Sequence, residues 1–402
     1  MKRERFSRAL GLFAALTLLA GCANAGEQPQ EPVTETPSPT LTAAPEPSPT
    51  PAPTEEELRA ARASGLLAGM TLHEKVCQLF VVHPEALAGS SPVLSADDTL
   101  GQALADWPVG GLLFDKSNMQ DRQQLTGLLT ELQTMSAIPL LLTCDEEGGR
   151  VNRLMSTVGT TWVGPMLDYK DAGTETAFAN AQTIAADLVS CGFNLDLAPV
   201  ADVWSNPDNR VIGDRAYSDD FAQAAGLVAA AVEGFHAGGT ACTLKHFPGH
   251  GDTTTDSHDG AAYVDQTLDE LRENELLPFR SGIAAGADAV MIGHLTVSDL
   301  DSEPAPFSYR IVTELLREEL GFTGVVMTDA LEMKAITDSY SSGEIAVKAV
   351  QAGVDILLCP LDLQSAASAL EEAVETDAIS QARLDESVQR ILELKLSRGL
   401  LP

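Results

Sequence analysis

The feature that most constrains the fold is the regular alternation of short apolar segments with helical patterns. Eight segments are short, apolar and rich in strand-forming residues: Gln78–Val82, Gly111–Phe114, Pro139–Thr143, Asn194–Leu197, Thr240–Leu244, Ala289–Ile292, Gly324–Thr328 and Ile356–Cys359. Helical patterns separate most of them; in residues 121–135, for example, leucines recur at helical spacing. This alternation predicts an α/β fold, a single (β/α)8 TIM-type barrel. A doubly wound open sheet is the alternative, but the count of eight and the placement of polar residues favour the barrel.

Several helix limits can be predicted as well. Capping-box pairs at Thr54–Glu57, Thr71–Glu74 and Thr267–Glu270 each predict the start of a helix. Apolar periodicity predicts two further helices, at residues 219–237 and 380–396. No boundary after residue 55 suggests a second domain, so residues 55–402 are expected to form the barrel.

The N-terminus has the pattern of an export signal. A basic head is followed by an apolar stretch that is shorter than the ~20 residues of a membrane span. Residues 1–21 are therefore expected to be a lipoprotein signal peptide that ends before Cys22, which becomes the acylated N-terminus. An ordinary signal, with Cys22 as a plain thiol, is the alternative. We expect a protein anchored by lipid to the outer face of a bacterial cell membrane.

Residues 22–54 continue from this cysteine as a segment rich in proline, threonine and glutamate. Such a composition cannot bury enough apolar surface to offset the entropy of ordering, so we expect a disordered tether. A proline-rich partner motif is the less favoured interpretation.

The charge balance limits the possible partners. The 402 residues include 58 acidic and 25 basic side chains, a formal net charge of −33. This excess argues against nucleic acids and anionic headgroups as partners, so membrane contact is expected through the lipid alone. The remaining cysteines, Cys77, Cys144, Cys191, Cys242 and Cys359, are odd in number and are expected to be buried thiols. We expect a monomer.

Polar residues follow several predicted strands directly. Asp145 follows the third strand, Asp202 the fourth, Lys245 and His246 the fifth, His294 the sixth and Asp329 the seventh. In a barrel of this class the carboxyl ends of the strands meet at one face, where active sites lie. A solvated loop explains such a residue at one strand end, but polar residues at five strand ends together indicate a site for a polar, polyhydroxylated ligand.

The segment after Lys245 holds His246, His250, Asp252, Asp256 and His258 in a short glycine- and threonine-rich stretch. One interpretation is a metal site, because histidine and aspartate ligate zinc. The other is a catalytic loop in which Asp256 orients His258. The stretch has no helical histidine pair and no cysteine pair, so we favour the catalytic loop and expect no metal there and no cofactor.

At these residues the chain resembles glycoside hydrolase family 3. The similarity covers nearly all of residues 55–402 and is carried by four stretches: Met70–Phe80, Asp145–Arg153, Ala198–Val203 and Gly321–Asp329. The stretch Lys245–His258 resembles, more narrowly, the branch of β-N-acetylglucosaminidases that act on cell-wall fragments.

The resemblance implies a retaining β-N-acetylhexosaminidase that acts on peptidoglycan fragments or chitin-type oligosaccharides. It implies that Asp329 is the nucleophile and that His258, paired with Asp256, is the acid/base. The resemblance also assigns the groups that hold the sugar: Asp145, Arg153, Arg215, Lys245 and His246. Two residues differ from those common in this branch: Ala330 stands where a second aspartate is frequent, and Thr328 where serine is frequent. These differences concern only the fine specificity for substrate.

Three other functions stay open. One is another substrate specificity within the family, such as that of a β-glucosidase or a xylosidase, although such enzymes usually take their acid/base from a second domain. Another is a phosphorylase, because a histidine repels phosphate less than a carboxylate would. The third is a sugar-binding lipoprotein without catalytic activity.

Overall fold

The predicted barrel is confirmed by a computed structural model, which describes residues 52–253 and 262–401. One sheet holds eight parallel strands in the order β10-β1-β2-β3-β4-β5-β7-β9. The strands are β1 (Phe80–Val82), β2 (Gly111–Leu113), β3 (Leu141–Cys144), β4 (Leu195–Asp196), β5 (Ala241–Phe247), β7 (Ala289–Ile292), β9 (Val325–Thr328) and β10 (Leu357–Leu358). A parallel bridge between Met327 and Ile356 joins the two end strands and closes the barrel.

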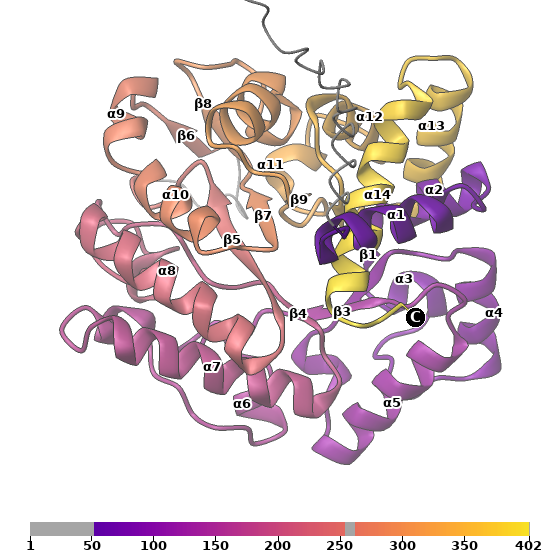
Figure 1. The fold of residues 1–402 in the computed structure, drawn as a ribbon, viewed down its shortest axis with the longest axis horizontal. Coiled ribbons are helices and arrows are strands. Elements are labelled where there is room, and N and C mark those ends of the chain that lie inside the picture. Colours follow the sequence, from indigo (N-terminus) through magenta and orange to yellow (C-terminus); the bar gives the residue numbers. More distant parts are fainter. Residues whose placement is uncertain (1–51, 254–261, 402) are drawn as a thin grey trace, which may run out of the picture. The chain divides into compact units, whose positions relative to one another are not determined.

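Helices cover the outside of this sheet. Figure 1 shows α5, α7, α8 and α10 around the strands. The helices are α1 (Glu55–Leu67), α2 (Leu72–Gln78), α3 (Glu85–Ala88), α4 (Asp98–Asp106), α5 (Arg122–Met135), α6 (Leu154–Thr157), α7 (Thr174–Cys191), α8 (Phe221–Gly238), α9 (Leu268–Glu273), α10 (Leu276–Ala284), α11 (Lys334–Thr337), α12 (Ser342–Ala352), α13 (Leu363–Glu375) and α14 (Gln381–Ser397), with a π-helix η5 (Arg310–Glu319). The three capping boxes begin α1, α2 and α9, as predicted.

Two details of the strands differ from the prediction. The fifth strand does not end at Leu244; β5 continues to Phe247 because the backbone of Lys245 accepts a hydrogen bond from Ala201 and that of Phe247 from Gly293. A further two-stranded parallel sheet, β6 (Ala262–Val264) and β8 (Leu295–Val297), was not expected. Both strands are three residues long, and neither belongs to the eight apolar segments that predicted the barrel.

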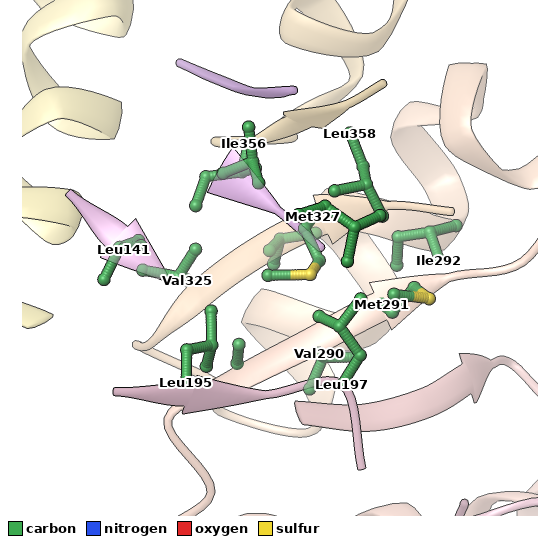
Figure 2. Close-up of a cluster of buried hydrophobic side chains, with 14 of the residues drawn as sticks. Leu141, Leu195, Leu197, Val290, Met291, Ile292, Val325, Met327, Ile356 and Leu358 are labelled. Atoms are coloured by element: carbon green, nitrogen blue, oxygen red, sulfur yellow. The ribbon is translucent and has the colours of Figure 1, made fainter. Parts of the chain in front are cut away.

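Apolar side chains from neighbouring strands fill the barrel. Figure 2 shows Leu141, Leu195, Met327 and Ile356 among the side chains of this cluster. All four are fully or nearly fully buried, so the inside of the barrel is a packed core rather than a pore at these positions. The five cysteines of the described residues are buried free thiols, as expected.

The predicted signal peptide, Cys22 and residues 22–51 of the tether lie outside the described residues, as do Asp256 and His258. Among the residues that are described, no helix has both the length and the hydrophobicity that a membrane span needs.

Candidate active site

A polar pocket of ≈ 330 Å³ opens at the carboxyl ends of the strands. The pocket is lined by every predicted nucleophile and sugar-binding residue: Asp145, Arg153, Arg215, Lys245, His246 and Asp329. Asp145 follows β3, Lys245 and His246 lie near the end of β5, and Asp329 follows β9. Parallel strands thus bring together residues that lie far apart in sequence.

Lys245 is the centre of a buried ion-pair network. Its Nζ lies 2.7 Å from Oδ1 of Asp145 and 2.6 Å from Oε1 of Glu147. Burial would lower the pKa of Lys245, but the two carboxylates raise it above its ordinary value, so the lysine stays charged. Its position is therefore fixed before any ligand arrives.

Arg215 completes this network from the short 3-10 helix η3 (Gly213–Arg215). Its Nε and Nη2 donate to the two oxygens of Glu147 at 2.8 and 2.7 Å. Burial alone would raise the pKa of Glu147, but Arg215 and Lys245 hold it well below its usual range. Glu147 was not assigned a role from the sequence, although it lies in the conspicuous Asp145–Arg153 stretch.

The loop after β3 folds back and delivers Arg153 to the pocket. The buried carboxylate of Glu146 accepts backbone hydrogen bonds from Arg153 and from Leu154 and so caps α6. Arg153 then reaches two acidic groups, with Nε 3.0 Å from Oδ1 of Asp115 and Nη2 3.3 Å from Oδ2 of Asp145. Glu146 does not line the pocket itself but holds the loop that carries Arg153 in position.

His246 is held by Asp202, a fully buried residue that follows β4. Oδ2 of Asp202 lies 2.7 Å from Nδ1 of His246, and Oδ1 accepts the backbone N–H of His250 at 2.6 Å. Burial would raise the pKa of Asp202, but His246 lowers it below its ordinary value. An ionised Asp202 accepts a hydrogen bond from Nδ1–H of His246, which orients the other ring nitrogen for a ligand. No role for Asp202 was predicted beyond its place after a strand.

Asp329 presents its side chain to the pocket from the end of β9. Its backbone N–H donates to Ile292 on β7, and its Oδ1 accepts the N–H of Ala330 at 2.8 Å. Burial would raise the pKa of Asp329, but His246 and His294 lower it below the ordinary value. An ionised carboxylate at the edge of a sugar-sized pocket is what a nucleophile requires.

A second group of polar residues forms one side of the pocket and was missed by the sequence analysis. His83 follows β1, with Nδ1 3.8 Å from Oδ2 of Asp115 and Nε2 3.7 Å from Oε1 of Glu332. The side chains of Cys359 and Glu332 raise the pKa of His83 to about 11. The sequence held a signal for two of these residues, because His83 and Asp115 directly follow the predicted strands Gln78–Val82 and Gly111–Phe114.

The start of the predicted catalytic loop can be followed as far as Thr253. His250 lines the pocket, and its Nδ1 lies 2.6 Å from Oγ1 of Thr253. A side chain at Gly251 would collide with the backbone carbonyl of Val203, which explains the glycine. Asp256 and His258, which follow, lie outside the described residues, so their pairing stays a prediction.

The metal interpretation of the histidine loop is not tested, because Asp256 and His258 lie outside the described residues. Within 52–253 and 262–401, one group of His, Cys and acidic side chains has ligand atoms close enough to share an ion. That group, His236, Cys242 and Asp288, does not line the pocket.

The chain is similar in sequence and in fold to known proteins. Residues 71–394 match the family model described as "Glycosyl hydrolase family 3 N terminal domain". Beta-hexosaminidase A of Pseudoalteromonas piscicida is 36% identical over 326 residues, which are 74% of this chain and 54% of that protein. A beta-hexosaminidase of Stenotrophomonas maltophilia is 40% identical over 267 residues, 63% of this chain and 78% of its own. The present chain thus spans about half the length of the first of these relatives.

Among solved structures, a glycoside hydrolase family 3 beta-N-acetylglucosaminidase from a Paenibacillus strain is similar to this chain. It has a TM-score of 0.78 and 40% sequence identity, and the match covers 83% of this chain and 63% of the other.

Proposed function

Because this chain belongs to glycosyl hydrolase family 3, we propose that it removes terminal N-acetyl-β-hexosaminyl residues from glycans. The observation that carries the proposal is the position of Asp329, an ionised carboxylate in the same pocket as the Lys245 network and His246. The beta-hexosaminidase names of the two similar proteins support the choice of sugar.

In the proposed reaction Asp329 forms a bond to the anomeric carbon while the bond from that carbon to the leaving oxygen breaks. His258, oriented by Asp256, donates a proton to the leaving oxygen. The same histidine then takes a proton from water, whose oxygen displaces Asp329 and releases the sugar with retained configuration. The role of Asp329 is supported by the geometry of the pocket, whereas the roles of His258 and Asp256 rest on the sequence.

The charged groups of the pocket suit a sugar, which offers both donors and acceptors. We propose that Asp145 and the side chains of Arg153 and Lys245 bind hydroxyl groups, together with Arg215 and His246. Because the network is already paired and buried, these groups need little reorganisation when a sugar binds. Peptidoglycan fragments and chitin-type oligosaccharides are the proposed substrates.

The test is release of chromophore from an aryl N-acetyl-β-glucosaminide by the full chain and by the Asp329→Asn variant. We expect release by the wild type and a loss of at least about 10³-fold in the variant. An aryl β-glucoside and an aryl β-xyloside serve as comparisons. No release by a folded wild type, combined with retained binding of N-acetylglucosamine, would favour an inactive sugar-binding protein instead.

The acceptor is tested by the same reaction in phosphate buffer. Hydrolysis gives free N-acetylglucosamine, whereas a phosphorylase gives the sugar 1-phosphate. We propose water as the acceptor; accumulation of the 1-phosphate as the main product would overturn this.

For the location of the protein, we propose export and attachment to the outer face of the bacterial cell membrane through lipid on Cys22. The apolar stretch that ends at this cysteine supports the proposal. Incorporation of radiolabelled palmitate into the wild type but not into the Cys22→Ser variant is the expected result. Equal incorporation into both would contradict it.

A further inference from the structure

Three side chains with metal-binding atoms meet at the amino-terminal ends of the strands, across the barrel from the pocket. They are His236 in the last turn of α8, Cys242 near the start of β5, and Asp288 directly before β7. Their ligand atoms all lie within 4.8 Å of one another. We propose that these three residues bind a divalent transition-metal ion, with Zn²⁺ as the best match.

The position separates this group from the proposed catalytic residues. Cys242 and Lys245 belong to the same strand, but Lys245 lies toward the end of β5 and lines the pocket, whereas Cys242 lies near its beginning. None of the three residues lines the pocket. The metal would therefore stabilise the barrel rather than take part in a reaction.

The kinds of ligand atom favour zinc. A thiolate sulfur, an imidazole nitrogen and a carboxylate oxygen are its usual ligands, and water can take the fourth position. Hard ions such as Mg²⁺ and Ca²⁺ prefer oxygen ligands alone. On binding, the S–H bond of Cys242 breaks, its proton passes to solvent, and a metal–sulfur bond forms.

The spacing between the imidazole of His236 and the carboxylate of Asp288 requires only a small adjustment. Nε2 of His236 lies 2.8 Å from Oδ2 of Asp288, which is a hydrogen-bond distance. Tetrahedral ligands at zinc bond lengths are separated by roughly 3.3–3.8 Å, so the imidazole would move away by about 0.5 Å. A metal ion would then occupy the place of the proton that now lies between these two atoms.

The carboxylate of Asp288 is already oriented for this purpose. Its Oδ2 accepts the backbone N–H of Cys242 at 3.1 Å, and its Oδ1 lies 3.2 Å from Nη2 of Arg398. The guanidinium therefore holds the oxygen that would not bind the metal, as second-layer groups do in metal sites. His236 lies at the carboxyl end of a helix, where the backbone dipole favours a positive charge.

An ion can reach the group from solvent. Asp288 lines a second cavity of ≈ 310 Å³ at this end of the barrel, next to Gly286. The side chain of His236 is 29% exposed, while that of Asp288 is 10% exposed.

The simpler alternative is that His236, Asp288 and Arg398 form only an ion-pair network that ties α8 and the end of α14 to the barrel. In that case the thiol of Cys242 contributes only buried volume. The two interpretations predict different effects of removing the sulfur of Cys242. Only a metal site would lose metal binding and the stabilisation that the metal gives.

The experiment uses the full chain, stripped with EDTA and then dialysed. Titration with Co²⁺ should give the near-ultraviolet absorption of a thiolate–cobalt bond. Zn²⁺ at about one hundred times its Kd should raise Tm by about 4 °C. The Cys242→Ser variant should lose both signals, whereas the control Cys191→Ser, which changes another buried cysteine, should keep them.

A second variant, His236→Gln, should lose both signals as well, which covers the case in which Cys242→Ser does not fold. An unchanged Tm and spectrum in the wild type would overturn the proposal, as would signals that persist in a folded Cys242→Ser protein. The result does not depend on glycosidase activity, so it can fail while the proposed function stands.

Discussion

Nδ1 of His246 lies 2.7 Å from Oδ2 of Asp202, and the same carboxylate binds the backbone N–H of His250. One buried group therefore sets the ring orientation of a pocket residue and fixes the start of the predicted catalytic loop. Because Asp202 is fully buried, its charge is not screened by water.

We expect Asp202→Asn to lower kcat/KM by about 10–100-fold, since the amide cannot hold the ring and the loop as an ionised carboxylate does. Steady-state kinetics with an aryl N-acetyl-β-glucosaminide measures this. The control is Asp208→Asn, an exposed residue on the same connection. Equal effects of the two substitutions would argue against a positioning role for Asp202.

Arg215 binds both oxygens of Glu147, a geometry that lysine cannot reproduce. We expect Arg215→Lys to lower kcat/KM at least tenfold, because the side chains of Glu147 and Lys245 lose their fixed positions. Arg122→Lys, at a surface residue that donates to Ser190, should change kcat/KM less than twofold. If Arg215→Lys behaves like this control, the network does not position the sugar.

The Asp256→Asn variant tests the predicted partner of His258. An amide cannot stabilise a protonated imidazole, so kcat should fall by about 10²-fold or more while KM changes little. The measurement is a comparison of kcat and KM for the same aryl substrate, with folding checked by circular dichroism. A normal kcat would remove Asp256 from the mechanism.

The activity should depend on pH in a predictable direction. The lowered pKa of Asp329 keeps the nucleophile ionised down to about pH 4, so the acid limb should lie below that value. The alkaline limb should follow loss of the proton from His258, whose ordinary pKa is ~6.5 and which Asp256 should raise. A profile of kcat/KM from pH 3 to 10 tests both limbs; an acid limb near neutrality would contradict the assignment of Asp329.

Lys395, on α14, is fully buried and donates to Oε1 of Gln78 at 2.6 Å. Burial lowers the pKa of Lys395 to about 7. The unfolded chain therefore binds more protons than the folded one between about pH 7 and 10.4, and stability should rise with pH across this window.

Replacing Lys395 with methionine removes the free-energy cost of burying its amino group. We expect Lys395→Met to raise the free energy of unfolding by roughly 1–3 kcal/mol at pH 7, with a smaller gain at pH 9. Urea unfolding at both pH values measures the difference. A gain that is larger at pH 9 than at pH 7 would show that the charge of Lys395 is not the cause.

The fold could be predicted because each strand of the barrel overlaps a short apolar segment that can be recognised in the sequence. Val325–Thr328, for example, is an apolar strand bounded by glycine and aspartate. Active sites of such barrels lie at the carboxyl ends of the strands, which places Asp329 in the pocket. The short strands β6 and β8 could not be predicted, since their pairing depends on tertiary contacts rather than on periodicity.

The site was only partly predictable for a similar reason. Asp145 and Lys245 follow strand-like segments, which marks them as candidates. The roles of Glu147 and Asp202 depend on which cation lies opposite each carboxylate in space, and a single sequence does not contain that information. The same is true of Arg398, which meets Asp288 across 110 positions of the chain.

Closure of the barrel ties the two ends of the domain together. The first strand, β1, pairs with β10, and β9, which pairs with β7 on one side, meets the chain next to β10 through the bridge between Met327 and Ile356. A nascent chain that extends only to Thr328 therefore exposes two unpaired strand edges, and we expect the barrel to form only after residue 358 has left the ribosome. Ribosome-bound chains that end before and after this point should differ sharply in resistance to protease.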